Sequence, residues 1–153
     1  MKLTYKQRIF TYFFIIFALF TVLVIFVEQR EEKAQRTESL QDRLDGYAEM
    51  IHTYINLNHL SDSNMKQIRT LAEAMPMDIR ISIIDNEGKV SFDKDVENLS
   101  TLDNHLDRPE IRNASYQGIG SNIRMSASTQ QEYLYYAKHY KDYYVRVALP
   151  YNI

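Results

Sequence analysis

Residues 78–92 read D-I-R-I-S-I-I-D-N-E-G-K-V-S-F, and this stretch decides the fold class. From Ile79 to Ile83, apolar and polar residues alternate, which is the two-residue period of a β-strand with one buried face. The Asp-Asn-Glu-Gly segment at 85–88 supplies turn residues, and a second apolar run follows from Val90 to Phe92. The pattern therefore predicts a β-hairpin.

A short helix is predicted between this hairpin and the rest of the sheet. Asp107 is of a residue type that caps helix N-termini, Pro109 suits the first turn, and Glu110 is placed to complete a capping box at N3. The helix is expected to reach about Tyr116, because the two glycines that follow at 118 and 120 stop it.

Three more β-strands are predicted after that helix, over Ile123–Ser128, Tyr133–His139 and Tyr143–Leu149. A turn at 140–142 joins the last two strands. Together with the hairpin they predict an α+β domain with a five-stranded antiparallel sheet covered by helices. This order of elements resembles that of PAS-like or single-Cache domains.

The segment before the hairpin is predicted to be helical. From Glu28 to about Asn58 a long amphipathic helix is expected, and its first part, 28–38, is almost wholly polar. A second helix is expected over Met65–Met75, where Pro76 ends it. The apolar stripe of the long helix either packs on its own domain or pairs with a second subunit. The stripe comprises Leu40, Leu44, Tyr47, Ile51, Tyr54 and Ile55.

Ile9–Val27 is an uncharged apolar segment of the length that a membrane requires. At the rise of an α-helix it spans about 28 Å, against a hydrocarbon core of about 30 Å. The residues at 24–28 lack the small side chains of a signal-peptide cleavage site, which predicts an anchor that is retained.

The charges that flank this segment predict its orientation. Lys2, Lys6 and Arg8 precede it, so the positive-inside rule places the N-terminus in the cytoplasm. We therefore expect residues 1–8 to be cytoplasmic, 9–27 to cross the bacterial inner membrane, and 28–150 to form an extracytoplasmic sensor domain. Residues 151–153 are expected to begin a link to a second transmembrane helix that is missing from this sequence.

The remaining composition narrows the classes of function. Three of the 18 basic residues and none of the 20 acidic residues lie in 1–27, so the chain beyond Val27 carries a net charge of −5. Such a domain is a poor match for nucleic acid, whose binding depends on neutralising phosphates. Cysteine is absent, which excludes disulfides and thiolate metal sites.

Four segments, taken together, resemble one family. They are D-I-R-I-S-I-I-D-N-E-G-K-V at 78–90, H-L-D-R-P-E-I at 105–111, G-I-G-S-N-I-R-M-S-A-S-T at 118–129 and Y-L-Y-Y-A at 133–137. Their order and spacing are similar to the extracytoplasmic sensor region of bacterial sensor histidine kinases of the phosphate and cell-wall types. The richness in tyrosine and the A-L-P-Y-N sequence at 148–152 look similar to such kinases from Bacteroides-like bacteria.

That resemblance implies a homodimer that pairs through the long N-terminal helix and responds to an unidentified small-molecule or protein stimulus. It also implies a cytoplasmic kinase part, absent from these 153 residues, that phosphorylates a response regulator. Two alternatives stay open. The same sensor can serve a chemoreceptor or a cyclic-dinucleotide enzyme, or the chain can be an anchored binding or scaffold protein.

No catalytic or metal-binding constellation is present in the sequence, and no cofactor is expected. The four histidines lie on different predicted elements, without the spacing of a metal site. In PAS-like folds a small molecule lies between the sheet and its covering helix, which makes Arg124 and Tyr136 candidate ligand residues.

His105 and Arg108 are further candidates, because they precede a helix N-terminus, where an anion is favoured. The structural alternative is that Asp107 and Glu110 cap the helix while Arg108 ties the loop to a strand. For Arg124, the structural alternative is a buried ion pair with Glu110 or another internal acid.

Overall fold

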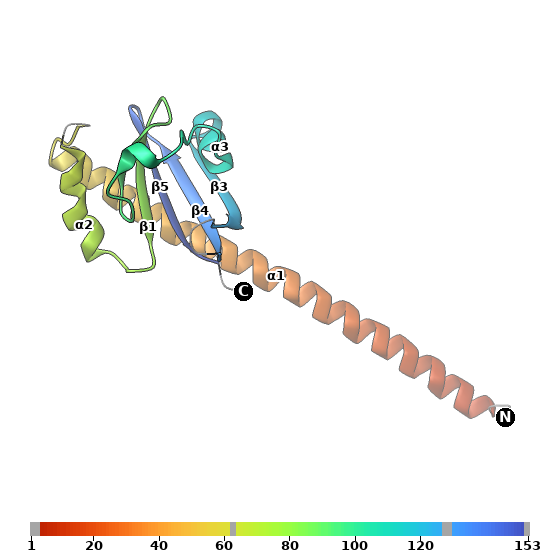
Figure 1. Ribbon diagram of the computed structural model, residues 1–153. Coiled ribbons are helices and arrows are strands. Elements are labelled where there is room, and N and C mark those ends of the chain that lie inside the picture. The colour runs from red at the N-terminus through yellow and green to blue at the C-terminus, as the bar shows by residue number, and fades with distance from the viewer. Residues whose placement is uncertain (1–3, 62–63, 127–129, 152–153) are drawn as a thin grey trace. The chain divides into compact units, whose positions relative to one another are not determined.

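The computed structural model describes residues 4–61, 64–126 and 130–151 (Figure 1). The chain divides into two compact units, Met1–Glu38 and Ser39–Ile153. Its helices are α1 (Tyr5–Leu57), η1 (Met65–Gln67), α2 (Ile68–Ala74), η2 (Leu99–Thr101) and α3 (Pro109–Gln117), where η denotes a 3₁₀-helix. Its strands are β1 (Arg80–Asp85), β2 (Val90–Asp93), β3 (Ile119–Met125), β4 (Glu132–His139) and β5 (Tyr143–Pro150).

The first unit consists of the N-terminal part of α1. Every large apolar residue from Ile9 to Val27 is exposed there, and α1 is the one described helix that is long and apolar enough to cross a membrane. The long apolar N-terminal helix is thereby confirmed. The polar segment 28–38 is also helical, and the unit ends where that segment ends.

The second unit contains a five-stranded antiparallel sheet in the order β2-β1-β5-β4-β3, which confirms the predicted fold class. The predicted strand bounds were least accurate for β3, which begins at Ile119 rather than Ile123. Gly118 ends α3 with a left-handed φ of 81°, and its N–H donates to the carbonyl of Ala114 at 2.9 Å, so the chain turns directly into the strand. The predicted end of this strand, 127–128, lies outside the described residues.

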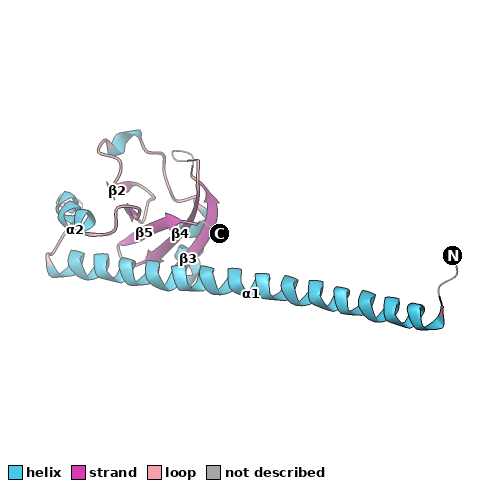
Figure 2. Ribbon diagram, turned by 90° about the horizontal axis from the view of Figure 1, so that it is seen from below, coloured by secondary structure: helices cyan, strands magenta, loops and turns pink. Residues whose placement is uncertain are grey.

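One face of the sheet packs against α1 and α2, and we call it the helix face (Figure 2). Leu44, Ile51 and Ile55 of the α1 stripe are buried in its own domain together with Ala48, and the other stripe residues are partly buried there. Of the two alternatives given for this stripe, packing on its own domain is therefore the one observed. The sheet contributes Ile81, Ile83, Phe92, Leu134, Tyr136, Val145, Val147 and Leu149 to the same core.

The opposite face, which we call the outer face, packs against α3. Ile111 and Ala114 of α3 contact Ile84 of β1 and Ala137 of β4 in a second, smaller apolar cluster. Because both faces are covered, all four residues Ile81–Ile84 are buried, although a strand with one covered face would expose alternate residues.

Candidate functional site

The outer face carries charged and aromatic side chains from several strands. Successive residues of a strand point to opposite faces, so residues paired across neighbouring strands point to the same side. Ser82 is paired with Arg146 between β1 and β5, and Arg124 with Tyr133 between β3 and β4. The buried polar residues on this side of the domain are Ser82, Asp93, His105, Glu110, Ser126 and Arg146.

Glu110 lies at the centre of this group. It belongs to the first turn of α3, and 0% of its side chain is exposed. Its Oε1 accepts a hydrogen bond from Nη2 of Arg124 at 3.3 Å and lies 3.7 Å from Nη1 of Arg146. We call these three residues the arginine–glutamate cluster. A carboxylate can be buried here because the two guanidinium groups offset its cost of desolvation.

Two buried atoms of this cluster have no hydrogen-bond partner among the described residues, namely Oε2 of Glu110 and Nε of Arg124. A buried polar group left unpaired costs about 1–3 kcal/mol. Nε of Arg124 requires an acceptor and Oε2 of Glu110 requires a donor, and a hydroxyl group supplies both. The cluster therefore has unused capacity to bind a polar group.

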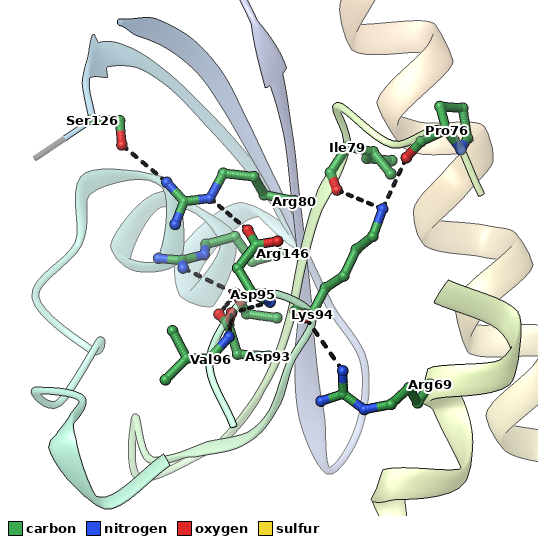
Figure 3. Close-up of polar contacts among 11 residues, drawn as sticks. Arg69, Pro76, Ile79, Arg80, Asp93, Lys94, Asp95, Val96, Ser126 and Arg146 are labelled. Atoms are coloured by element: carbon green, nitrogen blue, oxygen red, sulfur yellow. Dashed lines mark hydrogen bonds and ion pairs between the residues drawn. The ribbon is translucent and has the colours of Figure 1, made fainter. Parts of the chain in front are cut away.

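Arg146 extends the cluster towards β1 and β2. Its Nη2 donates to Oγ of Ser82 at 2.9 Å, and that hydroxyl donates to Oδ2 of Asp93 at 2.8 Å (Figure 3). Oδ1 of Asp93 accepts the backbone N–H groups of Asp95 and Val96. Burial lowers the pKa of Arg146, whereas the neighbouring carboxylates act in the opposite direction.

Two tyrosine rings lie beneath the arginines. The guanidinium carbon of Arg124 is 3.9 Å from the ring centroid of Tyr135, and that of Arg146 is 5.6 Å from the same centroid. Arg80 lies 5.6 Å from the ring centroid of Tyr133. Cations in these positions are attracted to the faces of the rings. The outer face thus presents guanidinium donors next to aromatic surface.

Three of the predicted ligand residues lie on this side of the domain. Arg124 belongs to the cluster, and its partner is Glu110, as the structural alternative expected. His105 is buried, and its Nδ1 hydrogen-bonds to the carbonyl of Asp103 at 2.7 Å. Burial, followed by the charge of Arg146, lowers the pKa of His105. Arg108 is half-buried, and its backbone N–H donates to the carbonyl of His105 at 3.0 Å.

The predicted capping of α3 was wrong. The N-cap residue is Arg108 rather than Asp107, Pro109 occupies the first position and Glu110 the second, and no side chain in the described part of the chain caps the helix. The carboxylate of Glu110 is turned to Arg124 and Arg146 instead. A buried ion pair therefore replaced the local capping interaction that the residue types suggested.

Tyr136, the fourth predicted ligand residue, lies on the helix face. Its hydroxyl donates to Oδ1 of Asp45 at 2.7 Å. Nζ of Lys138 lies 2.7 Å from both Asp45 and Glu49, and the hydroxyl of Tyr140 donates to Glu49 at 3.1 Å. We call these five residues the helix–hairpin cluster, because they join α1 to β4 and the β4–β5 turn.

The sheet separates Tyr136 from Arg124, so one small ligand cannot contact both on the faces where they lie. Tyr136 instead lines a separate pocket of about 210 Å³ beside β3, together with Gln41, Asn113, Gln117 and Ser121. Gln41 donates to the hydroxyl of Ser121 at 2.8 Å there.

The sequence analysis missed Arg146, Ser82 and Asp93. A signal was present, because Arg146 is the one charged residue in the otherwise uncharged run Y-Y-V-R-V-A-L-P at 143–150. A charged side chain in a central strand must find a buried partner. The partner could not be identified, because it comes from α3 and is brought close only by the tertiary fold.

The arrangement defines a class of protein. Within residues 4–61, 64–126 and 130–151, no three His, Cys, Asp or Glu side chains are grouped as a metal site would require. An apolar helix long enough for a membrane is followed by a sheet of order β2-β1-β5-β4-β3 with helices on both faces. Together these features define an α+β domain in one chain with a helix long and apolar enough to cross a membrane.

The particular family follows from comparison with known proteins. The chain belongs to the Single Cache-like family, whose model matches residues 35–147. The match begins near the end of the polar segment of α1 and ends within β5, so it covers the whole sheet apart from the last residues of β5. No curated protein and no solved structure matches the chain.

Proposed function

We propose that the chain is the extracytoplasmic signal-sensing module of a membrane-bound sensor histidine kinase in a two-component system. The observation that carries the proposal is a Single Cache-like domain in one chain with a helix able to cross a membrane. In this proposal residues 1–8 are cytoplasmic, 9–27 cross the inner membrane and 28–150 sense outside it.

The proposed histidine kinase activity is tested with the natural full-length protein. A histidine kinase incubated with labelled ATP should acquire an acid-labile phosphohistidine and pass the phosphoryl group to a response regulator. A chemoreceptor, a cyclic-dinucleotide enzyme or an anchored scaffold protein would acquire no such label. Those three are the alternative outputs, because sensor folds of one type serve many effectors.

We place the stimulus at the arginine–glutamate cluster, with His105 and Arg108 beside it. The support is the unused hydrogen-bonding capacity of Glu110 and Arg124 and the aromatic surface of Tyr135. Arg124→Gln in the full-length receptor should abolish the response to the stimulus while basal phosphorylation persists. The matched change Arg112→Gln, on the exposed side of α3, should preserve both activities. Loss of basal activity in Arg124→Gln would make Arg124 a structural residue.

We also propose that two subunits pair through α1. The stripe on Leu44 and Ile51 is buried in its own domain, so a partner must contact the opposite side of the helix. That side carries exposed residues at intervals of three and four, and Met50 and Leu57 are 50% and 75% exposed. A Cβ added at Gly46 would meet no atom within 4 Å, so its own domain does not require a glycine there. The exposed residues on that side of α1 are Arg43, Gly46, Met50, Thr53 and Leu57.

Disulfide crosslinking tests this pairing. Met50→Cys and Thr53→Cys in the full-length protein should each crosslink between subunits in membranes, because equivalent positions meet across a parallel helix pair. Lys141→Cys, in the exposed turn between β4 and β5, is the matched control and should form no crosslink between subunits. Equal crosslinking at all three positions, or none at 50 and 53, would contradict the pairing.

A further inference from the structure

A second pocket lies on the side of the domain near α2. It has a volume of about 330 Å³ and is formed by η1, α2, β2 and the segment that follows β2. Lys66 and Arg69 line it with their charged side chains, and Phe92, Val96 and Leu99 supply apolar surface. The volume is at the lower end of the range found for small-molecule sites.

Among the described residues, the two cations of this pocket have no ionic partner. Lys66 and Arg69 are one helical turn apart, and neither pairs with a carboxylate in the part of the chain that the structure describes. Arg69 lies over the ring of Phe92, 5.6 Å from its centroid, and makes one long hydrogen bond of 3.5 Å to the carbonyl of Lys94 (Figure 3). Most of its guanidinium donors are therefore available.

The two carboxylates that line the pocket, Asp93 and Glu97, form no ion pair with these cations within the described residues. Asp93 is committed to the hydroxyl of Ser82 and to two backbone N–H groups on the outer-face side. Glu97 is exposed and forms no ion pair within the described ranges. Lys94 does not line the pocket, because its Nζ donates to the backbone carbonyls of Pro76 and Ile79 at 2.8 and 3.1 Å. The lining thus carries two cations and two carboxylates, and neither cation is paired with a described carboxylate.

We propose that this pocket binds a small organic anion, with its charged group between Lys66 and Arg69 and a short apolar body against Phe92, Val96 and Leu99. A planar guanidinium and an ammonium group together suit a carboxylate or a sulfonate. The site is distinct from the arginine–glutamate cluster, since Phe92 belongs to the core of the helix face. The proposal does not depend on the output of the receptor.

Binding is measured by isothermal titration calorimetry on the full chain in detergent. The probes are butyrate and butanesulfonate, and butyramide is the uncharged molecule of matching shape. Both anions should bind with millimolar affinity or better, and butyramide should not bind. Preference for one anion would identify the charged group that the pocket selects.

Substitutions locate the binding. Lys66→Gln and Arg69→Gln should each weaken anion binding about tenfold or more, which is the loss expected for a charged hydrogen bond. Glu97→Gln should leave binding unchanged or tighten it, and Arg124→Gln should leave it unchanged. Lys66 is exposed, so its variant tests the pocket even if Arg69→Gln does not fold. Absence of binding by both anions, equal binding of butyramide, or unchanged affinity in both cation variants would overturn the proposal.

Discussion

Glu110 shows how one residue can join several elements. Its carboxylate is reached by Arg124 of β3 and Arg146 of β5, and so it ties α3 to two strands of the sheet. Removing one partner of a buried ion pair leaves an uncompensated charge, which costs more than the loss of an exposed pair.

We predict that Glu110→Ala lowers the free energy of unfolding by about 3 kcal/mol, because the buried guanidinium of Arg146 and the partly buried guanidinium of Arg124 lose their shared carboxylate. The matched control is Arg112→Ala, which breaks the exposed pair with Asp107 at 3.7 Å and should cost less than about 0.5 kcal/mol. Urea denaturation followed by tyrosine fluorescence measures both, since the chain has 12 tyrosines and no tryptophan. Equal effects of the two substitutions would contradict the importance of the buried pair.

Two neighbouring glycines are required for different reasons. Gly118 has a φ of 81°, but a Cβ there would meet no atom within 4 Å. Gly120 has no such conformation, and a Cβ there would collide with the backbone oxygen of Glu110 and the backbone nitrogen of Ala114. We predict that Gly118→Ala costs about 1 kcal/mol and Gly120→Ala about 2–3 kcal/mol, because only the second change must displace α3. If urea denaturation showed that Gly118→Ala is more destabilising than Gly120→Ala, α3 would not be packed this closely on β3.

At the scale of the element, the helix–hairpin cluster links α1 to β4 and the β4–β5 turn. Burial alone would raise the pKa of Asp45, but hydrogen bonds from Lys138 and Tyr136 outweigh it and lower that pKa. The hydrogen bond from Lys138 also lowers the pKa of Glu49. Burial alone would lower the pKa of Lys138, but the interactions with the two carboxylates outweigh burial and raise that pKa.

The sign of each shift defines the pH range in which the cluster stabilises the domain. A carboxylate with a lowered pKa contributes stability above its ordinary value, and that contribution is lost as the pH falls through the folded-state pKa. For Lys138, with a raised pKa, the contribution is present below the ordinary value of 10.5 and is lost as the pH rises through the folded-state pKa. The cluster is therefore fully effective near neutral pH.

We predict that Lys138→Gln destabilises the domain at neutral pH, and that the difference from the natural protein shrinks below the ordinary carboxyl pKa values of 3.8 and 4.5. The effect should be modest, because all three side chains are partly exposed. Urea denaturation of both proteins across this pH range measures it. A difference that does not change with pH would show that Lys138 acts through packing instead.

At the scale of the whole molecule, the orientation in the membrane is the property that matters most for function. We predict that Glu87→Cys and Asp142→Cys, both in exposed turns, react with a membrane-impermeant maleimide in cells with an intact inner membrane. Gly88, in the same turn as Glu87, is not a suitable position for the cysteine, because its φ is 85° and a side chain there would collide with Leu106. Thr4→Cys is the control and should react only after permeabilisation. Labelling of the turns only after lysis would reverse the topology.

Much of the secondary structure of this protein could be predicted from the sequence alone. The apolar segment Ile9–Val27, the isoleucine alternation at 79–83 and the two tyrosine-rich strands each reflect a local period, and a local period requires no knowledge of distant contacts. For that reason the fold class and the order of its elements were predicted. The helix stripe through Leu44 and Ile51 was also evident, although its partner was not.

Only the tertiary structure decided which partners these elements have. The stripe of α1 packs on its own sheet, Glu110 pairs with Arg124 and Arg146 rather than capping α3, and Tyr136 lies on the face opposite Arg124. These choices depend on strand order and on which face each helix covers. Residues such as Glu110 and Arg146 are 36 positions apart in sequence, and only the antiparallel order of β3, β4 and β5 beneath α3 brings them within ion-pair distance.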